Sequence, residues 1–121
     1  MTHDEYNFFC AALPAATYVT QWGGAHVWKV GGKVFCIGGW EGRNPAFSFK
    51  TSEIGFEVLR EREGFRPAPY LASRGLKWIQ AHSAEDDAEL RELIRQSHQI
   101  VAAGLSRKRR RELGLETPAI K

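Results

Sequence analysis

The chain has 121 residues, of which 43% are hydrophobic and 26% are charged. This composition is typical of a globular protein and excludes a disordered chain, and the length suits one domain with one core. No apolar run approaches the ~20 residues that a membrane-spanning helix needs, and the first residues lack the features of a secretory signal. We therefore expect a soluble, cytoplasmic protein with no membrane partner, and a monomer is the favoured state.

The formal net charge of +3 is unevenly distributed along the chain. Residues 106–121 carry six Lys/Arg against two Asp/Glu, whereas residues 1–105 carry eleven Lys/Arg against twelve Asp/Glu. The basic character therefore belongs to the C-terminal segment, and the rest of the chain is close to neutral. We interpret residues 1–105 as a single domain and residues 106–121 as a basic, flexible tail, because Gly114 and Pro118 argue for a loose terminus.

The N-terminal segment is predicted to form a short amphipathic helix. Thr2 and Glu5 have the spacing of a capping box, in which each residue bonds the backbone of the other. The apolar positions that follow have helical spacing until Pro14 ends the pattern; they are Tyr6, Phe9, Cys10 and Leu13.

Residues 16–50 are rich in β-branched and aromatic residues and contain three glycine pairs, which we interpret as turns. The pair at 31–32 lies between residues 27–30 and 33–37, and this pattern predicts a β-hairpin because glycine adopts the positive φ of a two-residue turn. The pair at 38–39 begins a glycine-rich stretch that we expect to be a flexible loop. Residues 46–50 alternate with period two and predict another strand, with Phe47 and Phe49 facing the core.

The second half of the chain alternates between helical and extended patterns. Ser52 is the expected cap of a helix that carries Ile54, Val58 and Leu59 and ends near Gly64. Residues 66–70 must be extended or turn-like because of their prolines, and residues 76–80 predict the last strand. Ser83 precedes an acidic first turn and the longest helix, whose apolar stripe is Leu90, Leu93, Ile94, Ser97 and Val101. The order of elements predicts an α+β fold, a two-layer sandwich with helices packed on one face of an antiparallel sheet.

A search for catalytic or metal-binding patterns gives no candidate. The four histidines lack metal-ligand spacing, and the acidic residues at 85–89 are explained by a helix start, although they could bind a cation. Cys10 and Cys36 are interpreted as two buried thiols, with a disulfide left open. We expect no metal, no cofactor and no enzymatic activity; an enzyme would require Cys36 to be exposed beside a histidine.

Basic and aromatic residues give the functional hypothesis. Strand alternation places Lys29, Lys50 and Lys77 on one sheet face, opposite Trp78, where cations could receive phosphates. Other residues expected to contribute around this face are Lys33, Arg66, Tyr70 and Arg74. The alternative is that these lysines are ordinary residues on the solvent side of a sheet.

A run of five cations follows the last helix, and it comprises Arg107, Lys108, Arg109, Arg110 and Arg111. Such a run attracts anions, with nucleic acid as the obvious partner. Two other interpretations remain open, a solvated helix end favoured by the helix dipole and a tail that promotes solubility.

Several segments of the chain resemble the MmcQ/YjbR family in order and spacing. They are residues 28–35, 47–50, 66–70, Trp78 and 93–98, and the most specific are the hairpin KVGGK and the segment RPAPY. The resemblance covers roughly residues 5–105 and implies a frataxin-like, CyaY-like sandwich whose hairpins act as wings, with a proposed DNA-binding role. His98 stands where the family usually has tyrosine, and the acidic first helix of frataxin-type iron handling is missing.

Together these patterns predict a non-enzymatic nucleic-acid-binding module, with DNA as the favoured partner. The alternative is a protein-interaction or small-ligand-binding module with an aromatic groove formed by Trp28, Tyr70 and Trp78 near the RPAPY segment.

Overall fold

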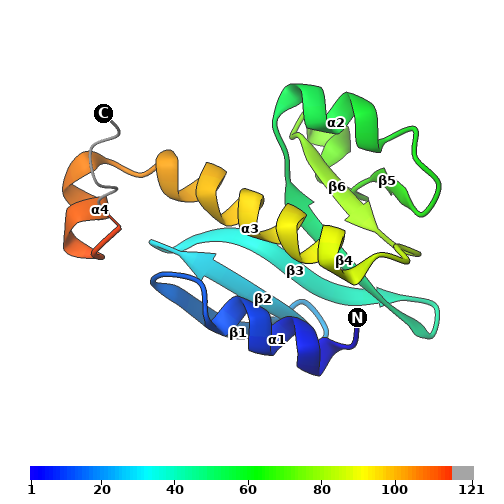
Figure 1. Cartoon of the computed structure of the whole chain (residues 1–121), viewed down its shortest axis with the longest axis horizontal. Helices are drawn as coiled ribbons and strands as arrows, with labels where there is room; N and C mark the ends of the chain where they lie inside the picture. The colour runs from blue at the N-terminus through cyan, green and yellow to red at the C-terminus, as the bar shows by residue number, and fades with distance from the viewer. Residues whose placement is uncertain (116–121) are drawn as a thin grey trace.

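The computed structural model describes residues 1–115. It contains a six-stranded sheet in the order β1-β2-β3-β4-β6-β5, in which every neighbouring pair is antiparallel. The elements are α1 (His3–Ala11), β1 (Ala16–Gln21), β2 (Ala25–Val30), β3 (Lys33–Glu41), β4 (Asn44–Lys50), α2 (Glu53–Leu59), β5 (Phe65–Pro67), the 3₁₀ helix η1 (Ala72–Arg74), β6 (Trp78–Ala81), α3 (Asp87–Ala103) and α4 (Arg107–Glu112). Helices α1 and α3 lie on the same side of the sheet (Figure 1), which confirms the predicted α+β fold.

Helix α1 begins as its sequence predicts. The Thr2 hydroxyl accepts a hydrogen bond from the Glu5 amide at 3.1 Å, and the Glu5 carboxylate accepts one from the Thr2 amide at 2.8 Å. Both halves of the capping box are therefore formed. Tyr6 and Cys10 are completely buried, and Phe9 packs against the core from a partly buried position.

The hairpin between β2 and β3 is confirmed, with Gly31 and Gly32 at φ +60° and +81°. The turn predicted at Gly38 is wrong, because β3 runs through it to Glu41. The reason for glycine there is packing: a Cβ on Gly38 would lie 2.5 Å from Cε2 of the Tyr6 ring. The missing side chain lets α1 approach the sheet.

A β-bulge increases the apolar surface that β3 presents to the helices. Trp28 pairs with Cys36 and the next residue of β2 pairs with Val34, so Phe35 is the additional residue. Phe35 and Cys36 are both completely buried in the same core cluster. The Ser97 hydroxyl of α3 donates to the Phe35 carbonyl at 2.6 Å and accepts from the backbone amide at the end of β4 at 2.8 Å.

Helices α2 and α3 differ in detail from the prediction. Ser52 caps α2 as expected, but Phe56 and Leu59 face the core, whereas Ile54 is 79% exposed. Of the three apolar residues expected on this seven-residue helix, Leu59 is buried, whereas Ile54 and Val58 are exposed and Phe56 is buried in their place. Asp86, rather than Ser83, caps α3 by accepting a hydrogen bond from the Glu89 amide.

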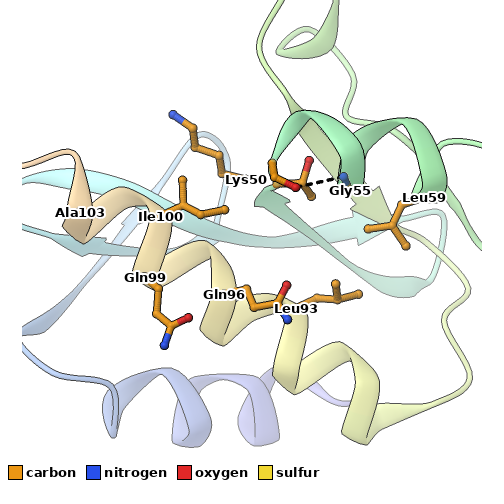
Figure 2. A pocket seen from close by; sticks show the side chains of 10 residues that line it. Lys50, Gly55, Leu59, Leu93, Gln96, Gln99, Ile100 and Ala103 are labelled. Carbon is orange, nitrogen blue, oxygen red and sulfur yellow. Dashed lines mark hydrogen bonds between the residues drawn. The ribbon is translucent and has the colours of Figure 1, made fainter. Parts of the chain in front are cut away.

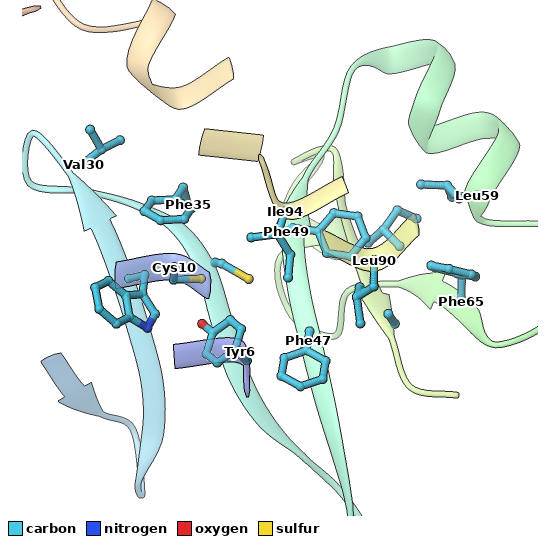
Figure 3. Packing of buried hydrophobic residues seen from close by; sticks show 14 of the residues in the cluster. Tyr6, Cys10, Val30, Phe35, Phe47, Phe49, Leu59, Phe65, Leu90 and Ile94 are labelled. Carbon is cyan, nitrogen blue, oxygen red and sulfur yellow. The ribbon is translucent and has the colours of Figure 1, made fainter. Parts of the chain in front are cut away.

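The core lies between the helices and one face of the sheet. Figure 3 shows aromatic residues of β3 and β4 meeting α1 on one side and α3 on the other. The completely buried side chains with the largest volumes include Tyr6, Phe35, Phe49 and Ile94. One continuous core therefore fixes the three larger helices on one face, and the opposite sheet face, hereafter the open face, has no helix over it among the described residues.

The start of the segment that we interpreted as a basic tail forms α4. The Ser106 hydroxyl caps this helix by accepting from the Arg109 amide, and Leu113 and Leu115 pack against the core from partly buried positions. The rest of the tail, residues 116–121, lies outside the described residues.

Candidate nucleic-acid interface

The sheet register assigns the predicted lysines to its two faces. Residues directly opposite each other in antiparallel strands project on the same side. Lys50 pairs with Trp78, and Lys29 pairs with Val34, which places both lysines on the open face near the end of the sheet where the β2–β3 hairpin turns. Both lysine side chains are half-buried. The prediction is therefore right for this pair.

The prediction is wrong for Lys77. It assumed that Trp78 points into the core, whereas Trp78 lies on the open face beside Lys50 and Lys77 points to the helix side. There the Lys77 ammonium lies 5.0 Å from the centre of the Phe56 ring of α2. A cation over an aromatic face is attracted to it, so Lys77 stabilises the α2 contact and belongs to a different surface.

Arg66 lies on the open face but is already paired. Its Nε donates to the Gln80 side chain at 2.7 Å, and its Nη2 donates to Glu41 at 2.7 Å. Gln80 projects on the same face as Arg66, because the two residues are directly opposite each other in the register. The carboxylate of Glu41 balances this charge, which makes Arg66 a weak phosphate site.

Tyr70 and Arg74 lie beyond the open face, in the segment between β5 and β6. Tyr70 is 85% exposed and has φ +69°, a left-handed conformation that is uncommon for a non-glycine residue. The Ser73 hydroxyl donates to the Tyr70 carbonyl at 2.7 Å and so braces this turn. Arg74 is exposed in η1.

The aromatic groove of the alternative hypothesis is not formed by the three residues predicted to line it. Trp28 pairs with Cys36 on the helix side, where its Nε1 donates to Asn7 at 2.9 Å, whereas Trp78 is on the open face. Both indoles are only 7% exposed, and Tyr70 is turned out to solvent. The sheet therefore separates the two tryptophans.

Leu105, which lies just before the Ser106 cap of α4, packs closely on the turn of the β2–β3 hairpin. Leu105 is 92% buried, and a Cβ on Gly31 at the hairpin turn would lie 2.6 Å from its Cδ1. Figure 1 shows α4 at the end of the molecule where this hairpin turns. Lys33 pairs with Val30 and so projects to the helix side of the turn, the side on which α4 lies.

We call this region the basic end. It consists of Lys29, Lys33, Lys50, Arg107, Lys108, Arg109, Arg110 and Arg111. The contact between Leu105 and Gly31 could not be derived from the sequence, although Leu105 continues the helical spacing of Leu90 and Ile94.

The cations of α4 have different roles. Arg110 turns back onto α3, where its Nη1 donates to the Ala103 carbonyl at 3.1 Å and to the Leu105 carbonyl. The Ala103 carbonyl is at the end of α3, where carbonyls lack intrahelical donors, and the Leu105 carbonyl lies in the link to α4, so Arg110 supplies a donor to both. Arg109 forms a 3.4 Å ion pair with Glu112, and Arg107 and Lys108 are exposed in the first turn.

A shallow hollow of about 340 Å³ lies between α2 and α3, and Lys50 is one of the residues that line it. Figure 2 shows Leu59 of α2 and Leu93 of α3 at one end of this hollow, with the Lys50 side chain extending away from them. The Lys50 ammonium is thus directed outward, where a phosphate could reach it.

The cysteine thiols are unsuited to nucleophilic chemistry. Cys10 and Cys36 are free and completely buried. A hydrogen bond with Cys36, together with burial, raises the pKa of the Cys10 thiol far above its ordinary value. A thiol that stays protonated is a poor nucleophile, and the condition that would make Cys36 a candidate catalytic residue is not met.

Within residues 1–115, no cluster of three or more His, Cys, Asp or Glu side chains is arranged to hold a metal ion. No helix in the same part of the chain combines the length and apolar character needed to cross a membrane.

The sequence also identifies the family. A family model described as YjbR matches residues 11–100. The chain belongs to the YjbR family. This confirms the resemblance seen in the hairpin and in the RPAPY segment. Among curated proteins, no sequence matches the chain.

Solved structures share the YjbR fold of this chain. A Deinococcus radiodurans protein with a DUF419 domain superposes with a TM-score of 0.81 at 23% identity, over 95% of this chain and 89% of that one. A Pseudomonas syringae protein gives a TM-score of 0.67 at 16% identity, over 84% of this chain and 99% of that one. At these identities the likeness concerns the fold.

Proposed function

We propose that this YjbR-family protein is a non-enzymatic module that binds nucleic acid through the basic end. The observation that carries the proposal is the contact between Leu105 and Gly31, which holds α4 beside the β2–β3 hairpin. This contact acts together with the packing of Leu113 and Leu115 on the core. With these contacts, cations far apart in the sequence surround one end of the fold, as phosphate binding requires.

The chemistry of the basic end favours phosphate contacts over base recognition. Its members are lysines and arginines, and the neighbouring aromatic on the open face, Trp78, is 7% exposed. Affinity should therefore be electrostatic and largely independent of sequence, because phosphate contacts fix position without distinguishing bases. Tyr70 is exposed enough to stack on an unpaired base, which would add affinity for single strands.

Double-stranded DNA is the favoured ligand for an electrostatic reason. A duplex carries one negative charge per about 1.7 Å of its axis, more than a single strand of the same length. A surface formed by the hairpin and α4 can contact several of these phosphates at once. Arg66 and Lys77 are excluded from the proposed site because each is already engaged inside the fold.

The proposal is tested by fluorescence anisotropy with short labelled duplex DNA, single-stranded DNA and RNA at ~50 mM salt, where phosphate contacts are strong. The test variant is Lys29→Gln combined with Lys50→Gln. The matched control is Arg43→Gln combined with Arg91→Gln, which removes the same charge from the opposite hairpin end and from the first turns of α3.

The test variant should bind duplex DNA several-fold more weakly than the control, because its lysines lie at the basic end. Absence of binding by the unmodified protein to all three nucleic acids would overturn the proposal. Equal reductions in affinity for the two variants would show that net charge alone matters and would remove the basic end as the site.

A further inference from the structure

A second hollow lies on the helix side of the molecule, apart from the open face. It has a volume of about 690 Å³ and is bounded by α3, by the turn between α1 and β1, and by α4 with the residues after it. This volume is within the roughly 300–1,000 Å³ that small-molecule sites occupy. The apolar part of its lining comprises Leu13, Pro14, Ala102, Ala103 and Leu115.

The position of α4 gives this hollow its shape. Leu115 forms one wall, and its amide donates to the Arg110 carbonyl at 2.8 Å, which folds the chain back after the helix. His98 also lines the hollow, is 95% buried, and its Nε2 bonds the Pro14 carbonyl at 2.8 Å. This bond ties α3 to the α1–β1 turn, two of the segments that line the hollow.

The polar part of the lining is cationic. Arg95 and Arg110 both line the hollow and both are half-buried. Arg95 forms an ion pair with Glu92, one turn away on α3. The Arg110 guanidinium donates to backbone carbonyls, which carry no formal charge. The whole of α4 has five cations against one carboxylate, so the field at this hollow is positive.

We propose that this hollow binds a small amphipathic organic anion, with an apolar body and a single carboxylate or similar head group. The apolar body lies against Leu13, Pro14 and Ala102. The head group lies toward Arg110, and toward Arg95 in exchange for the solvent-exposed ion pair of Arg95 with Glu92. A guanidinium pairs with a carboxylate in a geometry that a neutral or cationic head group cannot reproduce. The proposal rests on the lining of this hollow and does not depend on nucleic-acid binding, although Arg110 belongs both to this lining and to the basic end.

The test uses the full chain and three probes with the same apolar body: octanoate, 1-octanol and octylammonium. Binding is followed by changes in backbone amide chemical shifts. Octanoate should shift the amides of Gly114 and Ala102 at this hollow and leave Gly55, at the hollow between α2 and α3, unchanged. Octylammonium should bind at least about tenfold more weakly, a difference of about 1.4 kcal/mol.

Two variants identify the head-group contact. Arg95→Gln should weaken octanoate binding several-fold without changing octanol binding, whereas Arg91→Gln, one turn earlier on the same helix and outside this lining, should change neither. The proposal is overturned if octanoate at up to about 10 mM does not shift the Gly114 amide. At that concentration a ligand with a Kd of about 1 mM would occupy about 90% of the sites. It is equally overturned if octylammonium binds as well as octanoate, or if both arginine variants behave alike.

Discussion

Replacement of Gly38 by alanine tests how α1 is held against the sheet. The added methyl group would lie 2.5 Å from Cε2 and 3.0 Å from Cδ2 of the Tyr6 ring. The ring cannot easily move away, because Tyr6 is completely buried and its hydroxyl donates to the His26 carbonyl at 2.8 Å. Gly38→Ala must therefore displace either α1 or the strand.

The expected cost combines two destabilising effects and one stabilising effect. Overpacking of a buried site costs about 1–3 kcal/mol, and loss of the Tyr6 hydrogen bond adds about 1 kcal/mol. Removing a glycine restricts the unfolded chain and returns about 0.4–1 kcal/mol. The net effect should be a loss of about 1–3.5 kcal/mol in the free energy of unfolding.

Gly39→Ala is the matched control. Gly39 is the next residue of the same strand, and a Cβ there meets nothing within 4 Å. Its φ is not in the left-handed region, so alanine should be tolerated and should raise the free energy of unfolding by about 0.4–1 kcal/mol. The two neighbouring substitutions should thus change stability in opposite directions.

Urea unfolding followed by circular dichroism measures both variants against the unmodified protein. A stabilised or unchanged Gly38→Ala protein would refute the packing of the Tyr6 ring on Gly38. Equal destabilisation by both substitutions would show that glycine is needed in this strand for its backbone and not for its missing side chain.

Three further predictions concern other parts of the fold. Gly31→Ala should lower the free energy of unfolding more than Gly32→Ala. Both substitutions incur the strain of a positive φ, but only the methyl group at position 31 meets Leu105. Equal decreases for the two variants in urea unfolding would contradict this prediction. Ser97→Ala should cost about 1–3 kcal/mol by the same assay, since it leaves two buried backbone groups without their hydroxyl partner, and a decrease below about 0.5 kcal/mol would refute that role. Burial lowers the pKa of His3 below its ordinary value, so the unfolded state binds the proton more readily and stability should fall as the pH decreases from about 7 toward 5; a His3→Gln protein with the same pH dependence would argue against this origin.

The sequence predicts those parts of the fold that depend on local patterns. The capping box at Thr2, the glycine turn at residues 31–32 and the alternation of Phe47 and Phe49 are each determined by a few adjacent residues, and each is found in the structure. The need for a residue without a side chain at position 38 could not be predicted in this way. Its reason is a ring 32 positions earlier in the chain, which meets it only after α1 packs on the sheet.

The candidate site shows the same limit. Lys29 and Lys50 are assigned to the correct face because alternation holds within each strand. Lys77 is misassigned because the prediction takes Trp78 as a core residue, and hydrophobicity alone does not tell which face a large aromatic occupies. The position of α4 beside the hairpin depends on the contact of Leu105 with Gly31, which no short-range pattern reveals.

The most direct test of the basic end is the salt dependence of duplex DNA binding. We compare the unmodified protein with an Arg107→Gln and Lys108→Gln variant, which keeps Arg110 and its hydrogen bonds to the end of α3. If both side chains contact phosphates, the slope of log K against log salt should become less negative by about 1.8, or about 0.9 for each phosphate that is no longer neutralised. An unchanged slope with retained binding would contradict the account, because the DNA would then lie away from α4.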